Sequence, residues 1–222
     1  MKRVVFCDID GTLLNLKRTF VRSLFKQIFN DFGLEIPDLS KITFAGKTDY
    51  SIFRSMLPGN EHYFDDIKNE YVSAMEKELM PDHITLTPHV ENVLSYLQNQ
   101  GYAIGLLTGN FEAVAATKLK AASINDFFHF GAYGGTVNNR NELAVVAHET
   151  AENYLGVAIK PENMIIIGDT PADVACAKNY GSKSVAVTTG SYSARELKKH
   201  RPYKLLHSLK NPDSWLPGLF NI

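Results

Sequence analysis

The chain has 222 residues, of which 45% are hydrophobic and 21% charged, and its formal net charge at pH 7 is −1. This length and composition are typical of a globular protein that can build one sizeable core and a smaller module. The near-neutral charge gives no electrostatic footprint for nucleic acid, and we recognise neither a membrane span nor a signal peptide, so we expect a cytoplasmic protein without nucleic-acid or membrane partners.

The chain opens with an apolar strand that runs into two acidic residues. Val4, Val5 and Phe6 form the predicted strand, and Asp8 and Asp10 follow before the turn at Gly11. Ligands of open α/β sheets bind outside the carboxyl ends of the strands, so both aspartates are expected at the mouth of a site. Side chains two residues apart share a face, and paired carboxylates imply a cation or a shared proton. An ordinary Asp-Gly turn explains the same residues without any function.

Residues 15–83 are predicted to form a nearly all-helical module. A wide apolar face at helical spacing indicates its first helix, with members Val21, Leu24, Phe25, Ile28, Phe29 and Phe32. Loop or hinge positions are expected at residues 37–40 and 81–82, where proline lies beside short polar residues.

From residue 84 onward, strands and helices alternate, which predicts a mainly parallel sheet with helices on its faces. Helices are expected over residues 88–99, 111–121 and 141–155, and another begins at Pro171. The predicted strands cover residues 103–107, about 127–132, 164–167 and 184–187, with a short one near 203–206. The fold class is therefore α/β.

Polar residues follow two of these strands. Thr108 ends the strand at 103–107, and its hydroxyl with free N–H groups of Gly109 and Asn110 would form an anion site at a helix N-terminus. A simple N-cap or turn role for Thr108 fits as well. Asp169 follows a wholly apolar strand and needs a partner for its charge, whereas Asp173 is also explained as part of a capping box with Thr170.

Together these segments resemble the haloacid dehalogenase-like (HAD) hydrolases, in the phosphoglycolate phosphatase/β-phosphoglucomutase-like subgroup with a helical cap. The family motifs are DxDGT, here Asp8 to Thr12; a strand ending in Ser or Thr, here ending at Thr108; and GDxxxD, here Gly168 to Asp173. The resemblance covers essentially the whole chain. It implies a Rossmann-like three-layer core built from residues 1–14 and 84–222, with a helical cap domain at 15–83.

The resemblance also implies roles for the two aspartates. Asp8 would be the nucleophile that forms an aspartyl-phosphate, and Asp10 would be the general acid and base. The backbone carbonyl of Asp10 ligates the metal in the family. Dehalogenases of the family lack the second aspartate, so Asp10 favours phosphate ester chemistry.

Other site residues are carried over in the same way. Arg140 is the candidate for the basic third motif, which is usually lysine; it is otherwise an exposed loop cation, and Lys160 is the reserve candidate. The expected cofactor is Mg²⁺, which prefers oxygen ligands, and the expected metal site comprises Asp8, Asp10, Asp169 and Asp173. Lys47 and Thr48 lie where relatives place residues that contact substrate, although Lys47 fits a solvated surface cation equally well.

The sequence thus predicts an enzyme, a phosphatase that hydrolyses a small phosphomonoester with Mg²⁺ through an aspartyl-phosphate. The alternatives are a sugar phosphomutase of the same superfamily and, from another class, a non-catalytic binding module that retains the fold. The expected partner is a small phosphorylated metabolite, and the sequence leaves the natural substrate and the oligomeric state open.

Overall fold

The computed structural model describes residues 2–220 and contains a six-stranded sheet in which every strand pair is parallel. The strand order is β5-β4-β1-β6-β7-β8. The strands are β1 (Val4–Cys7), β4 (Ala103–Thr108), β5 (Gly131–Tyr133), β6 (Met164–Gly168), β7 (Lys183–Val187) and β8 (Lys204–Leu206). The expected α/β fold with a parallel sheet is confirmed.

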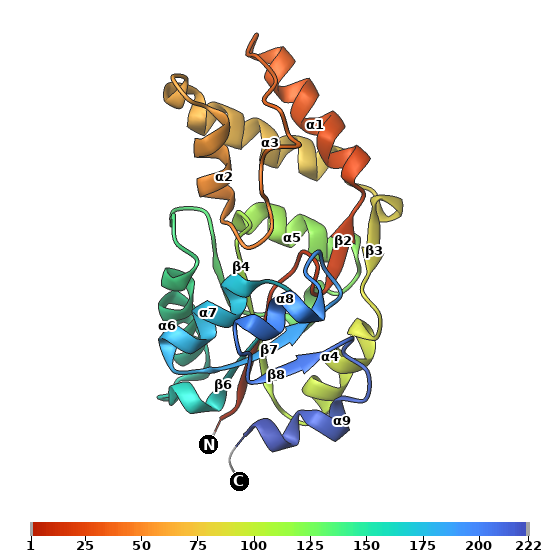
Figure 1. Ribbon diagram of the computed structural model, residues 1–222, viewed down its shortest axis with the longest axis vertical. Coiled ribbons are helices and arrows are strands. Elements are labelled where there is room, and N and C mark those ends of the chain that lie inside the picture. The colour runs from red at the N-terminus through yellow and green to blue at the C-terminus, as the bar shows by residue number, and fades with distance from the viewer. Residues whose placement is uncertain (1, 221–222) are drawn as a thin grey trace.

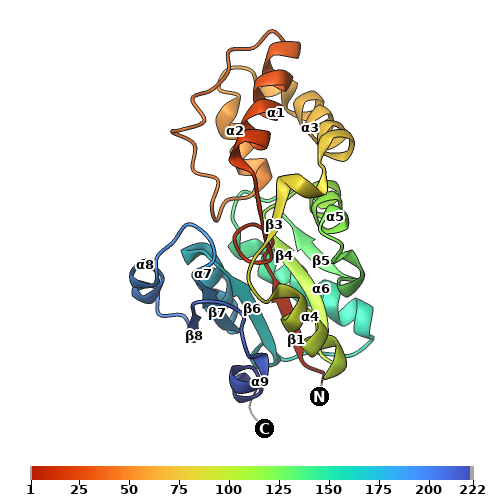
Figure 2. The ribbon, with the colours of Figure 1, turned by 90° about the vertical axis from the view of Figure 1, so that its right-hand side faces the viewer.

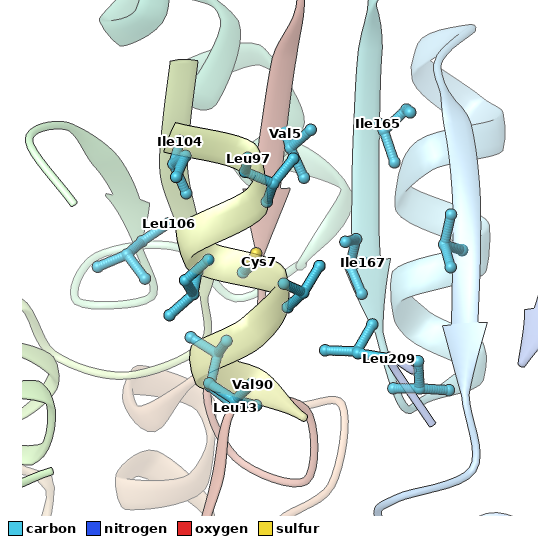
Figure 3. Close-up of a cluster of buried hydrophobic side chains, with 14 of the residues drawn as sticks. Val5, Cys7, Leu13, Val90, Leu97, Ile104, Leu106, Ile165, Ile167 and Leu209 are labelled. Carbon is cyan, nitrogen blue, oxygen red and sulfur yellow. The ribbon is translucent and has the colours of Figure 1, made fainter. Parts of the chain in front are cut away.

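Helices cover both faces of this sheet. The long helices of the core are α4 (Val90–Asn99), α5 (Glu112–Ala121), α6 (Asn141–Leu155) and α7 (Pro171–Tyr180), and the shorter ones are α8 (Ala194–Lys199) and α9 (Pro212–Trp215). The side chains of β1 alternate between two clusters: Val5 and Cys7 pack with α4, α5 and α9, while Val4 and Phe6 pack with α6 and α7. Figure 3 shows the first cluster, with Cys7 of β1 behind α4 and with Ile165 and Ile167 on the neighbouring strand β6.

A second, helical unit stands over one end of the sheet (Figures 1 and 2). It consists of α1 (Arg18–Asp31), α2 (Asp49–Met56) and α3 (Phe64–Glu78). Its buried aromatic side chains include Phe25, Phe53 and Tyr71, whose rings lie 5.1–5.7 Å apart by centroid. The region therefore contains helices, as expected, and its assignment as a cap domain over residues 15–83 remains a prediction.

The two units are joined by an antiparallel ribbon that the helical reading of residues 15–83 missed. Strand β2 (Leu14–Leu16) pairs with β3 (Ile84–Leu86), so β2 lies across the first predicted boundary of the helical module and β3 begins directly after the second. Residues 34–48 contain no helix, which also departs from the expectation. Three-residue strands carry too little periodicity to be recognised in a sequence.

The remaining predicted elements are found with shifted ends. Helix α4 begins two residues later than expected, and the strand expected at about 127–132 is confined to β5 because residues 125–127 form a 3₁₀ turn. Further 3₁₀ turns are Glu61–Tyr63, Pro81–His83, Pro161–Asn163 and Pro217–Leu219. Within residues 2–220, none of the helices combines the length and the apolar character needed to cross a membrane.

Candidate active site

The ends of three neighbouring strands bring the candidate residues together. Strand β1 lies between β4 and β6 in the sheet. After β1, the chain adds β4 and β5 on one side of it and then β6, β7 and β8 on the other side, so the direction of strand addition reverses at β1. Asp8 follows β1, Thr108 ends β4 and Asp169 follows β6. The carboxyl ends of parallel strands at such a reversal form the usual crevice for ligands, so the expected location is where the polar residues meet.

Asp8 is buried at the centre of this crevice, with 4% of its surface exposed. Its Oδ1 lies 2.6 Å from Nη2 of Arg140, and its Oδ2 accepts a longer hydrogen bond of 3.3 Å from the Thr12 hydroxyl. Burial raises the pKa of Asp8 to about 7 even though the Arg140 guanidinium opposes that shift. Oδ1 of Asp8 is thus held by the Arg140 cation, whereas the hydrogen bond that Oδ2 accepts is long and therefore weak.

Arg140 bridges two carboxylates. Its Nη2 lies 2.6 Å from Asp8 and 2.6 Å from Oδ1 of Asp173, while Oδ2 of Asp173 accepts from the backbone and hydroxyl of Thr170 at 3.0 and 2.6 Å. The capping box at the start of α7 therefore exists, and it holds Asp173 against Arg140. The Nε–H group of Arg140 is the buried side-chain polar group without a partner among residues 2–220. Lys160, the reserve candidate, is 63% exposed and faces Glu162 at 3.9 Å.

Asp169 is the least neutralised acidic group of the crevice. Its Oδ1 lies 3.4 Å from the Thr12 hydroxyl, whose single hydrogen is shared between Asp169 and Asp8. Burial, followed by the charges of Asp8 and Asp173, raises the pKa of Asp169 to about 8. Asp8, Asp169 and Asp173 can each offer one oxygen atom within 4.8 Å of the others. The glycine at position 11 has a φ of +86°, and a Cβ there would collide with the Asp169 carboxylate. Clustered carboxylate oxygens with uncompensated charge fit a hard divalent cation such as Mg²⁺.

The loop after Thr108 differs from the expected anion site. Thr108 is buried and its Oγ1 accepts from the backbone N–H of Asn110 at 3.2 Å, so that N–H is not free. Helix α5 begins at Glu112, and the N–H of Phe111 donates to Asp49 of α2 at 2.8 Å. The hydroxyl proton of Thr108 stays available to a ligand, whereas the helix end is already used to dock the helical unit.

The helical unit touches this loop closely. The N–H of Asp49 donates to the carbonyl of Gly109 at 2.6 Å, and a Cβ at position 109 would collide with the carbonyl of Lys47. Gly109 is therefore required for close approach of the two units. Its predicted role through a free N–H is not tested by any contact in the structure.

Asp10 has a cationic partner that the sequence reasoning missed. The Nζ of Lys118 lies 2.8 and 2.7 Å from the two carboxylate oxygens of Asp10, and Asn110 donates its side-chain amide to Oδ2 at 3.0 Å. A signal was present: Lys118 lies on the buried face of α5 with Val114, Ala115 and Leu119, where a charge demands a partner. For Asp49 and Phe111 no such signal exists, because they are 62 residues apart.

A cavity of about 620 Å³ lies between the helical unit and the crevice. Lys47 lines it, but Thr48 does not: Thr48 is buried as the N-cap of α2, accepting from Ser51 N–H at 3.2 Å and donating to the Val137 carbonyl at 2.7 Å. The helical unit lines the other side with Arg18, Arg22, Phe25, Phe53 and Tyr71. The crevice is thus continuous with a cavity whose side formed by the helical unit is apolar and basic.

Comparison with known proteins identifies the family. Residues 4–187 match the family model for haloacid dehalogenase-like hydrolases. The chain is 24% identical over 192 residues to a phosphoglycolate phosphatase of Aquifex aeolicus, covering 85% of each chain. It is 20% identical over 207 residues to a pyrophosphatase PpaX of Bacillus mycoides, covering 93% of each.

Solved structures have the same fold. A protein described as a predicted phosphatase from Clostridium acetobutylicum superposes with a TM-score of 0.75 at 21% identity, covering 98% of this chain and 99% of that one. A protein described as a predicted phosphoglycolate phosphatase from Haemophilus somnus gives 0.74 at 17% identity, covering 96% and 97%. The expectations of an enzyme and of a Rossmann-like core are confirmed, and the chain belongs to the haloacid dehalogenase-like hydrolases.

Proposed function

We propose that this protein is a Mg²⁺-dependent phosphatase that hydrolyses a small phosphomonoester through an aspartyl-phosphate on Asp8. The observation that carries the proposal is the state of Asp8: it is buried, lines the cavity and is held on Oδ1 by Arg140, while its Oδ2 accepts a long hydrogen bond of 3.3 Å from Thr12. A carboxylate placed in this way is an established covalent nucleophile. The phosphatase and pyrophosphatase names of the relatives support a small phosphorylated substrate.

In the first half-reaction, Oδ2 of Asp8 attacks phosphorus and the bond to the leaving oxygen breaks. The Thr108 hydroxyl and the unpartnered Nε–H of Arg140 are donors for the phosphate oxygens, whose negative charge must be offset. Asp10 gives a proton to the leaving oxygen. In the second half-reaction, Asp10 takes a proton from the water whose oxygen bonds to phosphorus, the bond between phosphorus and Asp8 Oδ2 breaks, and inorganic phosphate leaves with the Asp8 carboxylate restored.

Asp8, Asp169 and the backbone carbonyl of Asp10 would hold the Mg²⁺. When bound, the ion offsets the repulsion between the Asp8 carboxylate and the phosphate dianion. Asp173 supports this site from behind, because both of its oxygens are already engaged by Arg140 and Thr170. We propose that residues 15–83 act as the cap that closes the cavity and excludes water.

The experiment is a screen of phosphate esters with purified protein, in which released inorganic phosphate is measured. Asp8→Asn should abolish release and EDTA should suppress it reversibly. Activity that survives in Asp8→Asn would overturn the proposal. Isomerised sugar phosphate formed without free phosphate would identify the phosphomutase instead.

A further inference from the structure

Lys118 is a buried cation whose three hydrogen-bond contacts within residues 2–220 all go to Asp10 and Asn110. An ammonium group has three hydrogens to donate, and its Nζ lies 2.8 Å from Oδ1 of Asp10, 2.7 Å from Oδ2 of Asp10 and 2.8 Å from Oδ1 of Asn110. Asn110 closes the triangle by donating Nδ2 to Oδ2 of Asp10 at 3.0 Å. Lys118, Asp10 and Asn110 therefore form one connected cluster.

The burial of Lys118 is costly, and its helix does not require it. The side chain is 5% exposed, and its neighbours on the inner face of α5 are Val114, Ala115 and Leu119. An apolar residue such as leucine or methionine would satisfy that face without any desolvation of charge. The cation is thus explained by its effect on Asp10 rather than by the packing of α5.

The cluster leaves the two oxygens of Asp10 unequal. Each carboxylate oxygen has about two lone-pair sites. Oδ2 accepts from Lys118 and Asn110 and is saturated, whereas Oδ1 accepts from Lys118 alone. Asp10 lines the cavity, and 43% of its side chain is exposed there. Oδ1 is consequently the atom with room for a proton.

Two separate cations also keep the aspartates of the first motif apart. Arg140 holds Asp8 from the side of Asp173, and Lys118 holds Asp10 from α5. Without Lys118, the half-exposed Asp10 carboxylate would keep only the hydrogen bond from the Asn110 side chain among its side-chain contacts within residues 2–220. A general acid must stay within hydrogen-bond reach of the oxygen it protonates.

We propose that Lys118, with Asn110, is a positioning residue that fixes the Asp10 carboxylate so that its Oδ1 exchanges the catalytic proton. This inference rests on the proposed phosphatase function. When the bond between phosphorus and the leaving oxygen breaks, the proton passes from Oδ1 of Asp10 to that oxygen; when water attacks, Oδ1 receives a proton from it. Lys118 remains protonated throughout.

The test compares two esters of similar shape whose leaving groups differ in proton demand. Phenyl phosphate releases a phenolate of pKa about 10, whereas p-nitrophenyl phosphate releases a much weaker base. The value of kcat/KM reports the steps up to phosphoryl transfer to Asp8, so hydrolysis of the intermediate does not obscure it. Lys118→Met should lower kcat/KM for phenyl phosphate by about 100-fold and for p-nitrophenyl phosphate by less than about 10-fold.

Lys120→Met is the matched control, since Lys120 is exposed on the same helix, and it should change neither value. In an Asp10→Asn background, Lys118→Met should have no further effect on the ratio of the two esters, because it acts through Asp10. Lys118→Gln repeats the comparison if the methionine variant does not fold, and its ester ratio should move in the same direction.

A loss that is equal for both esters would overturn the inference, because it would indicate a purely structural or substrate-binding role. Failure of the underlying function has a different signature: Asp8→Asn would then hydrolyse both esters as well as the wild type does. Failure of the positioning role is therefore detected in the Lys118 variants, and failure of the phosphatase function is detected in Asp8→Asn.

Discussion

At the scale of single residues, two buried cations share the acidic groups of the site unevenly. Arg140 pairs with Asp8 and Asp173, and Lys118 pairs with Asp10. Asp169 forms no salt bridge within residues 2–220, and its Oδ1 lies 3.4 Å from the Thr12 hydroxyl. Of these aspartates, Asp169 is therefore the one without a paired cation in the described part of the chain, and a divalent cation bound beside it would gain the most electrostatic stabilisation.

Removing Arg140 should damage both stability and activity. Arg140→Gln leaves Asp8 and Asp173 buried without their cation, so we expect the free energy of unfolding in urea to fall by about 3–5 kcal/mol. We expect kcat/KM to fall at least about 100-fold, because a donor to the reacting phosphate is lost. Lys160→Gln, at an exposed lysine near Glu162, is the control and should cost less than about 1 kcal/mol. Loss of activity in the Lys160 variant with an unaffected Arg140 variant would place the third motif at Lys160.

We expect Asp169 to lower the stability of the metal-free protein and to be needed for Mg²⁺ binding. Without metal, Asp169→Asn removes a carboxyl group whose pKa is raised to about 8 by burial and by the charges of Asp8 and Asp173, and with it the cost of folding that group at pH 7, so the variant should have a higher Tm than the wild type in EDTA. Mg²⁺ at 100 times its Kd should stabilise the wild type by about 2.7 kcal/mol and leave the variant almost unchanged. Calorimetric scans with EDTA and with Mg²⁺ measure both effects. Equal stabilisation of the two proteins by Mg²⁺ would remove Asp169 from the metal site.

At the scale of elements, the sequence predicted the long and regular parts and missed the short contacts. The apolar strands before Asp8, Thr108 and Asp169 were recognisable because buried parallel strands are continuously hydrophobic. The β2–β3 ribbon was not, since three-residue strands separated by the whole helical module leave no local pattern. The positions of Asp8, Thr108 and Asp169 at one sheet edge follow from topology, whereas the contact of Asp49 with Phe111 depends on tertiary packing.

Helix α2 carries a buried acidic residue at its docking point, and this should make its contribution to stability depend on pH. Burial raises the pKa of Asp49 to about 6, although the Lys118 charge and the Phe111 N–H oppose the shift. A carboxyl group whose pKa is higher in the folded than in the unfolded protein adds no cost when protonated in both states. Its cost grows as the pH rises from about 4 and is complete above about 6.

Asp49→Asn should therefore stabilise the protein at pH 8 and not at pH 4. The asparagine carbonyl can still accept from the Phe111 N–H, and the buried charge is gone. The shift of about two pKa units corresponds to at most about 3 kcal/mol at pH 8. Urea unfolding of both proteins at the two pH values measures the difference. A variant less stable than the wild type at pH 8 would show that the charge on Asp49 strengthens docking.

At the scale of the whole molecule, the helical unit and the sheet unit share one apolar cluster. Phe111 and Val114, at the start of α5 in the core, pack among buried side chains of α1, α2 and α3. The ring of Phe53 lies 5.3 Å from that of Phe111 by centroid, which places an aromatic contact directly across the boundary. Such sharing predicts that the two units unfold together.

Phe53→Ala tests this coupling. Phe53 is 1% exposed, so truncation should lower the free energy of unfolding by about 3–5 kcal/mol, whereas Phe44→Ala, at a ring that is 37% exposed, should cost much less. The single tryptophan, Trp215, lies in α9 of the sheet unit and reports unfolding of that unit by fluorescence, while far-UV circular dichroism reports all helices. If the units are coupled, Phe53→Ala shifts both urea midpoints equally. An early circular dichroism transition with an unchanged Trp215 midpoint would show instead that the helical unit unfolds by itself.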